Sequence, residues 1–221
     1  MFIRTALKKG YGAYKRFRMW FREAIMLPIR RKRLRNQDFS IISCDCTGGV
    51  IYHDLKKQFT SCTINMYMMA EDFVKFCSDI KYWVNQTMVE VESEYDFPVA
   101  LLGEDGLTLY LVHYSSVAEA QRKWDERKKR INYDNLFIMM NDRNNCSEKC
   151  IEDFDELPYD NKVIFTHIPH ENIESAYVIK NCEKDPFVKT MTEYLSRLSL
   201  FRRYEQFDYV SWLNGENASN C

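Results

Sequence analysis

The sequence contains little glycine and little proline, with 7 Gly and 5 Pro among its 221 residues. This scarcity excludes collagen-like and low-complexity proteins, which are rich in one or both. The sequence also lacks any run of about 18 apolar residues, the length that a helix needs to span a bilayer. Basic residues interrupt the N-terminus throughout, so the apolar stretch of a cleavable signal peptide is missing. We therefore expect neither a spanning helix nor a cleaved leader.

Apolar residues make up 46% of the chain and aromatic residues 14%, which is enough for a sizeable core. Charge is divided unevenly. Residues 1–35 hold 12 basic residues and one acidic residue, whereas the remainder holds 19 basic and 31 acidic residues. The sequence therefore predicts a basic segment over residues 1–35 with a separate partner, followed by a single domain over residues 36–221.

The basic segment has the pattern of an amphipathic helix, with a break expected near Gly10 and Gly12 and an end near Pro28. One face is apolar and contains Ala13, Phe17, Trp20, Ala24 and Leu27. The opposite face is cationic and contains Lys15, Arg18 and Arg22. Such a helix suits an anionic membrane surface, and docking on the acidic remainder of the chain is the alternative. Nucleic acid is not expected as a partner, because the basic face is confined to one segment.

Strand and helix signals alternate along residues 36–221. Apolar runs typical of strands occur at 39–43, 63–69, 107–114, 136–140, 163–168 and 177–180. Helices are expected at 50–57, 71–84 and 116–130, and over most of 187–213. This order predicts an α/β layered fold with a largely parallel sheet.

The turn after the first predicted strand, Ser43-Cys-Asp-Cys-Thr-Gly-Gly49, is the strongest local feature. In open α/β sheets, ligands bind at the carboxyl ends of strands. Gly48 and Gly49 would let the backbone approach a ligand closely, and the N-terminus of a helix starting here would favour a diphosphate. A tight turn without a ligand is the alternative, since the pattern is neither a Walker loop nor a dinucleotide fingerprint.

Cys46 is the candidate nucleophile of this turn, because a helix N-terminus lowers the pKa of a thiol. His113 would be its base and Asp45 would assist, whereas an inert thiol is the alternative. No metal site is expected, because Cys44 and Cys46 lack the second matched pair of a zinc site. The eight cysteines are scattered, and free thiols in a reducing cytoplasm are expected.

Further binding residues are expected beside His113. Tyr114 follows it at the end of a predicted strand. Trp124, Arg127 and Arg130 recur at intervals of three on the next helix, where Arg suits phosphate and Trp stacks on a sugar or base. The alternative places Trp124 in the core and the arginines in solvent. More polar residues follow later strands at the same edge: Asp142, Arg143, His167 and His170.

In this order the motifs resemble the DUF1919 family over residues 36–213. The resemblance is carried by Asp38-Phe-Ser-Ile-Ile-Ser43, Cys46-Thr-Gly-Gly49, Asp72-Phe73 with Lys75-Phe76, His113-Tyr114, Lys123-Trp124 with Arg127 and Arg130, and Ile131-Asn132 with Asp134-Asn135. The family usually has Asn-Asn-Cys-Trp-Gly-Gly where this chain has Cys44-Asp-Cys-Thr-Gly-Gly49. This departure puts in doubt which donor and acceptor molecules the chain would use if it shares the activity of the family.

The resemblance implies a Rossmann-like fold and a role in exopolysaccharide or capsule biosynthesis. We expect a transferase that acts on a phosphate-activated sugar or lipid-linked glycan, with a nucleotide sugar as the candidate donor. Gly48, Gly49, Arg127 and Arg130 would hold phosphate. The alternatives are a Cys/His-dependent acyl transferase or hydrolase, and a non-catalytic glycan-binding or nucleotide-sugar-binding accessory protein. The basic segment would hold the protein on the inner face of the cell membrane.

Overall fold

The centre of the fold is a four-stranded parallel sheet in the order β1-β5-β6-β7. The computed structural model describes residues 2–104 and 106–216, with side chains from residue 10 onward; Met1 and residues 217–221, Cys221 among them, lie outside the described residues. All three strand pairs are parallel. This arrangement confirms the predicted α/β class. The strands are β1 (Ser40–Ser43), β5 (Leu136–Asn141), β6 (Lys162–Thr166) and β7 (Ala176–Val178).

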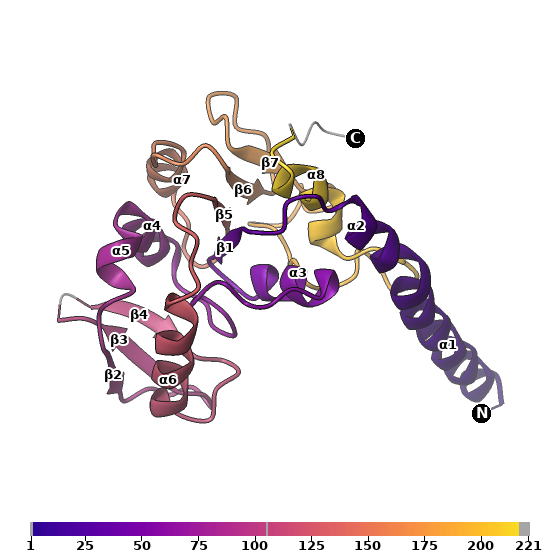
Figure 1. Ribbon diagram of the computed structural model, residues 1–221. Coiled ribbons are helices and arrows are strands. Elements are labelled where there is room, and N and C mark those ends of the chain that lie inside the picture. The colour runs from indigo at the N-terminus through magenta and orange to yellow at the C-terminus, as the bar shows by residue number, and fades with distance from the viewer. Residues whose placement is uncertain (1, 105, 217–221) are drawn as a thin grey trace.

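Apolar side chains cover both faces of this sheet, which is why its strands read as continuous apolar runs. Ile41 and Phe137 lie in the core on one face, together with side chains of α3 and α8. Ile42 and Ile138 lie in the core on the other face, together with side chains of α7. Figure 1 shows these helices around the sheet. They are α3 (Thr47–Leu55), α7 (Glu148–Asp155) and α8 (Tyr209–Leu213).

A second, antiparallel sheet of three strands lies between β1 and β5 in the sequence, in the order β2-β3-β4. The run 107–114 was expected as one strand, but β4 ends at Tyr110 and pairs with β3. Gly103 and Gly106 adopt positive φ angles of 78° and 48° in the connection between β3 and β4, where glycine has little steric penalty. The predicted 71–84 helix is divided at Asp79, which caps α5. The elements are α4 (Ala70–Ser78), α5 (Ile80–Trp83), β2 (Met88–Val91), β3 (Val99–Leu102), β4 (Leu107–Tyr110) and α6 (Val117–Lys128).

The basic segment is helical from Phe2 to Arg33, so the predicted break at the glycines and the predicted end near Pro28 are wrong. It consists of α1 (Phe2–Phe21), a π-helical turn (Arg22–Met26) and α2 (Leu27–Arg33). The N–H of Leu27 bonds to the carbonyl of Arg22, five residues earlier, and this wider turn accommodates the proline. No helix in the described part of the chain is both long and apolar enough to cross a membrane.

Residues 187–213 were expected to be mostly helical, and that prediction is wrong. The segment contains only a 3₁₀ turn (Arg203–Gln206) and α8. Its irregular part is fixed by side chains of distant elements: Asp142 accepts a hydrogen bond from the Val188 N–H, and Arg22 donates to the Leu200 carbonyl. These tertiary contacts override the local helical pattern.

Candidate functional site

A cavity of about 430 Å³ lies beside the carboxyl ends of β1 and β5. This is the edge at which open parallel sheets bind ligands. Three predicted site residues, Asp45, Cys46 and His113, line it together. The other lining residues are Tyr67, Val112, Arg143, Asn144, Thr190 and Thr192.

Asp45 shapes the turn that leads from β1 into α3. Its Oδ1 accepts the N–H of Thr47 at 2.8 Å, which satisfies a donor at the helix start. Its Oδ2 accepts the side-chain amide of Asn141 at 3.0 Å, so the ends of β1 and β5 are tied together. Asp45 therefore acts first as a positioning residue for the cavity wall.

Cys46 is half-buried at the start of α3, but its thiol is not activated there. Burial and the neighbouring Asp45 carboxylate raise the pKa of Cys46 to about 11. The expected lowering of its pKa is therefore wrong, because burial and the negative charge of Asp45 both disfavour the thiolate. At neutral pH the thiol is protonated.

Gly48 serves helix packing rather than ligand approach. A Cβ atom at this position would lie 2.9 Å from the Ser43 Cβ and 3.1 Å from a methyl group of Ile41. The missing side chain lets α3 lie directly against β1. A Cβ at Gly49 would meet the Ile64 side chain at an ordinary 3.5 Å.

His113 is exposed on the loop that follows β4, and its N–H donates to the Asn65 carbonyl at 3.3 Å. Its neighbour Tyr114 is buried. The Tyr114 hydroxyl donates to the Ile64 carbonyl at 2.8 Å and accepts from Arg127 at 2.7 Å. The guanidinium of Arg127 also lies 5.2 Å from the ring centre of Phe59. Tyr114 and Arg127 thus form an internal network and do not line the cavity.

Trp124, Arg127 and Arg130, which were predicted to bind a ligand together on α6, do not form a binding surface. Trp124 is fully buried, packs on Phe76 and donates its indole N–H to the Val84 carbonyl at 2.9 Å. Arg130 pairs with Glu126 on the same helix at 3.8 Å. Neither side chain lines the cavity, because α6 packs its Trp face on the core beneath the antiparallel sheet.

Arg143 is the residue that supplies positive charge to the cavity. It follows β5, and its guanidinium donates to the Thr190 hydroxyl at 2.8 Å. The sequence predicted Arg143 at this edge, because it directly follows an apolar strand. Thr190 and Thr192 carried no such signal, since they lie in the irregular segment that was expected to be helical.

A buried aspartate and a histidine form a pair at the same edge of the sheet. Asp142 accepts from the backbone N–H of His167 at 2.7 Å and contacts the His167 Nδ1 at 2.6 Å. A carboxylate on Nδ1 fixes the ring orientation, as in many general bases. His167 does not line the cavity. Asp142 also holds the Val188 N–H, so the pair anchors two loops beside the cavity.

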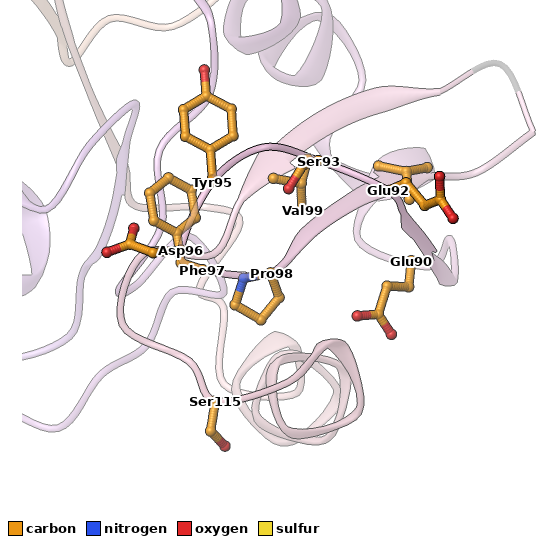
Figure 2. A pocket seen from close by; sticks show the side chains of 10 residues that line it. Glu90, Glu92, Ser93, Tyr95, Asp96, Phe97, Pro98, Val99 and Ser115 are labelled. Atoms are coloured by element: carbon orange, nitrogen blue, oxygen red, sulfur yellow. The ribbon is translucent and has the colours of Figure 1, made fainter.

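A second cleft of about 560 Å³ lies beside β2 and β3. Figure 2 shows Glu90 and Glu92 on one side of it and Asp96 turned away on the other, beside the stacked rings of Tyr95 and Phe97. Its polar groups do not converge on one point, so we do not assign it a ligand. Among the described residues, no group of three His, Cys, Asp or Glu side chains could hold a metal ion.

The fold and the cavity define an α/β protein with a small-molecule-sized site at the carboxyl edge of a parallel sheet. The chain belongs to the family described as domain of unknown function DUF1919, whose model matches residues 17–214. It is also similar to a Haemophilus influenzae protein titled "Uncharacterized protein", with 41% identity over 184 residues, 83% of this chain and 88% of the relative. The resemblance inferred from the motifs is therefore confirmed. The family match begins at Phe17, inside α1.

Proposed function

We propose that the protein is a group transferase that binds a phosphate-activated sugar or lipid-linked glycan in the cavity described above. One observation carries the proposal: His113 and Arg143 line one cavity at the carboxyl edge of the sheet. Its volume is within the range of roughly 300–1,000 Å³ typical of small-molecule sites. The role that the resemblance implies, exopolysaccharide or capsule biosynthesis, fits this class of reaction.

The residues of the cavity suit transfer to a hydroxyl group. His113 would take the proton of the acceptor hydroxyl, and the acceptor oxygen would form a bond to the anomeric carbon. The bond between that carbon and the phosphate oxygen would break, and its electron pair would leave with the phosphate. Arg143 would neutralise the negative charge of the leaving group. A nucleotide sugar is the proposed donor.

Acyl transfer or hydrolysis through Cys46 and His113 receives less support. A thiol with a pKa of about 11 is largely protonated at neutral pH, and the thiolate is the nucleophile. A non-catalytic, glycan-binding or nucleotide-sugar-binding role would use the same cavity without turnover. These alternatives are outcomes of the experiment below.

The proposed location is the cytoplasm, at the inner face of the cell membrane. The seven cysteines that the structure describes are all free. Free thiols are typical of proteins in a reducing compartment. Two of them, Cys44 and Cys62, are buried and have their pKa values raised by burial, which suits inert core thiols.

Ligand-induced thermal stabilisation tests the proposal. The purified protein is heated with nucleotide sugars, nucleoside diphosphates, sugar phosphates or acyl-CoA. A ligand at about 100 times its Kd stabilises the folded state by about 2.7 kcal/mol, which is a measurable shift in Tm. We expect a shift with a nucleotide sugar that is lost in Arg143→Gln and retained in Arg122→Gln, an exposed arginine of α6.

The outcomes separate the alternatives. A shift with acyl-CoA alone would transfer the assignment to acyl chemistry. Nucleotide-sugar binding with no product formed from any tested acceptor, and no effect of His113→Gln, would favour the accessory role. Equal loss of stabilisation in both arginine variants would remove the cavity from consideration.

A further inference from the structure

The N-terminal helix docks on the rest of the protein through arginines. The Arg22 guanidinium lies 3.0 Å from the Asp54 carboxylate and 2.5 Å from that of Glu205, and Arg22 is only 3% exposed. Arg18 is 7% exposed and stacks 3.4 Å from the ring centre of Tyr194. Two residues of the predicted cationic face, Arg18 and Arg22, are therefore docked, whereas Lys15 is exposed. Leu27 of the predicted apolar face is buried as well, at 1% exposed. A helix on a protein core ordinarily buries its apolar face.

The docked arginines leave large apolar side chains in solvent. Phe17 is 49% exposed, Trp20 57%, Ile25 38% and Ile29 56%. The rings of Trp20 and Phe21 each lie 6.0 Å from that of Phe17. The π-helical turn adds a residue per turn, so Phe21, Ile25 and Ile29 continue the row that Phe17 begins. We call these five side chains the outward face. An exposed apolar row of this kind marks an interaction site.

Basic residues accompany the outward face. Among residues with described side chains, the exposed cations of α1 and α2 that have no ion pair are Lys15, Arg16 and Lys32. Glu23 is exposed there too, and it pairs with Arg31 at 3.6 Å. The sequence places further basic residues in α1, namely Arg4, Lys8 and Lys9. At 100° per residue, Arg16 lies beside Trp20, whereas Lys15 lies on the opposite side of α1 from the outward face. Positive charge therefore borders the outward face at Arg16.

We infer that the outward face is a docking site for an anionic lipid bilayer, with the helix lying in the plane of the headgroups. Apolar rows with a tryptophan sit at the headgroup level, and adjacent lysines and arginines are attracted to anionic lipids. Figure 1 shows α1 extending from the body, with its N-terminal end farthest out. Two exposed side chains of the loop that holds α1, Leu198 (69%) and Phe201 (45%), add apolar surface nearby.

A second copy of this chain is a weaker occupant, because pairing two outward faces would bring Arg16 of both copies together. The inference differs from the expectation drawn from the sequence in one respect. Arg18 and Arg22 are committed to the body and do not face lipid. The inference does not depend on the proposed transferase activity.

Trp20 provides a native probe for the test. The other tryptophans, Trp83, Trp124 and Trp212, are at most 7% exposed, so a change of emission on lipid binding reports Trp20. The full chain is mixed with vesicles of equal phosphatidylglycerol and phosphatidylethanolamine, and separately with phosphatidylcholine vesicles. We expect a blue shift and co-sedimentation with the anionic vesicles, weakened by salt. Trp20→Phe should still sediment but lose the blue shift.

Matched variants test the face itself. Phe17→Glu and Trp20→Glu should each lower the affinity for anionic vesicles about tenfold or more, because each removes a large apolar side chain from the interface. Val89→Glu, which adds the same charge at a 58% exposed position of β2, should bind as the unmodified chain does. Thermal unfolding confirms that all three variants are folded.

Four results would overturn the inference. The full chain could fail to sediment with anionic vesicles, or it could bind equally to phosphatidylcholine. The Phe17→Glu and Trp20→Glu variants could bind as tightly as Val89→Glu. Alternatively, Trp20 emission could shift with protein concentration alone, with Phe17→Glu dissociating a dimer, which would make a second copy the occupant.

Discussion

Single residues at the β1–α3 turn set the geometry of the candidate site. Gly48 allows close contact of the helix with the strand, Asp45 ties the turn to Asn141, and Cys46 presents a protonated thiol to the cavity. None of these roles requires a ligand. They explain how the turn can hold its shape beside the cavity that His113 and Arg143 line.

Substitution of the two glycines should separate packing from helix propensity. Gly48→Ala should destabilise the protein by about 1–3 kcal/mol, because its Cβ would lie 2.9 Å from that of Ser43. Gly49→Ala should be neutral or stabilise by up to about 1 kcal/mol, since the added methyl has room and alanine favours a helix. Urea denaturation of both variants measures the difference. Equal effects would contradict the packing role.

The reactivity of Cys46 should follow its raised pKa. Its thiolate fraction should increase about tenfold per pH unit from neutrality up to a midpoint of about 11. Iodoacetamide labelling, followed site by site with mass spectrometry, measures this profile. In the urea-unfolded chain the same cysteine should titrate about two units lower. A midpoint near 8 in the folded protein would instead restore Cys46 as a candidate nucleophile.

At the scale of elements, α3 connects the N-terminal helix with the candidate site. Its first turn follows Asp45 and Cys46, and its last turn carries Asp54. Asp54 pairs with Arg22 and also accepts a hydrogen bond from the Tyr204 hydroxyl. Burial lowers the pKa of Arg22, but the negative charges of Glu205 and Asp54 raise it by more. The net pKa is above the ordinary value, and the guanidinium stays charged.

Loss of this buried cation should be costly. Arg22→Met should destabilise the protein by about 3–5 kcal/mol, because Asp54 would keep a buried charge without its ion-pair partner. Arg16→Met, on the exposed side of α1, should change stability by less than about 0.5 kcal/mol. Chemical denaturation compares the two. A small effect in both would show that the helix is only loosely attached.

At the scale of the whole molecule, the basic segment and the body should behave as one unit. Buried and half-buried arginines of this segment pair with acidic residues of the body: Arg22 with Asp54 and Glu205, and Arg30 with Glu205. The family match also begins within α1. The boundary between residues 35 and 36, drawn from the charge division, therefore crosses a set of buried contacts.

Calorimetry should show that the basic segment and the body unfold together. The full chain should unfold in a single transition, and a chain without residues 1–35 should melt about 10 °C lower or more, since several buried ion pairs lose their cations. Two separate transitions in the full chain, or an unchanged Tm after truncation, would show instead that the segment is an independent appendage.

The sequence by itself determined the α/β class and the edge at which the site lies. Buried parallel strands such as 136–140 are apolar along their whole length, and polar residues must follow where such strands end. Local rules also predicted a helix that starts near residue 116, and Ser116 caps it by accepting the Glu119 N–H. Asp45 and Cys46 could be placed at this edge for the same reason, whereas His113 reaches the cavity from the loop after the antiparallel strand β4.

Only the tertiary structure decided which face of each helix turns inward. The amphipathic pattern of residues 1–35 does not say which face of the helix docks on the body. The docked face is set by Asp54 and Glu205, which lie 32 and 183 residues from Arg22. Likewise, the core beneath the antiparallel sheet takes Trp124 inward, and distant side chains hold residues 187–202 in an irregular path. Periodicity depends only on residues close together in the sequence. The orientation of each helix depends on contacts between charged and apolar side chains that come together only in the folded chain.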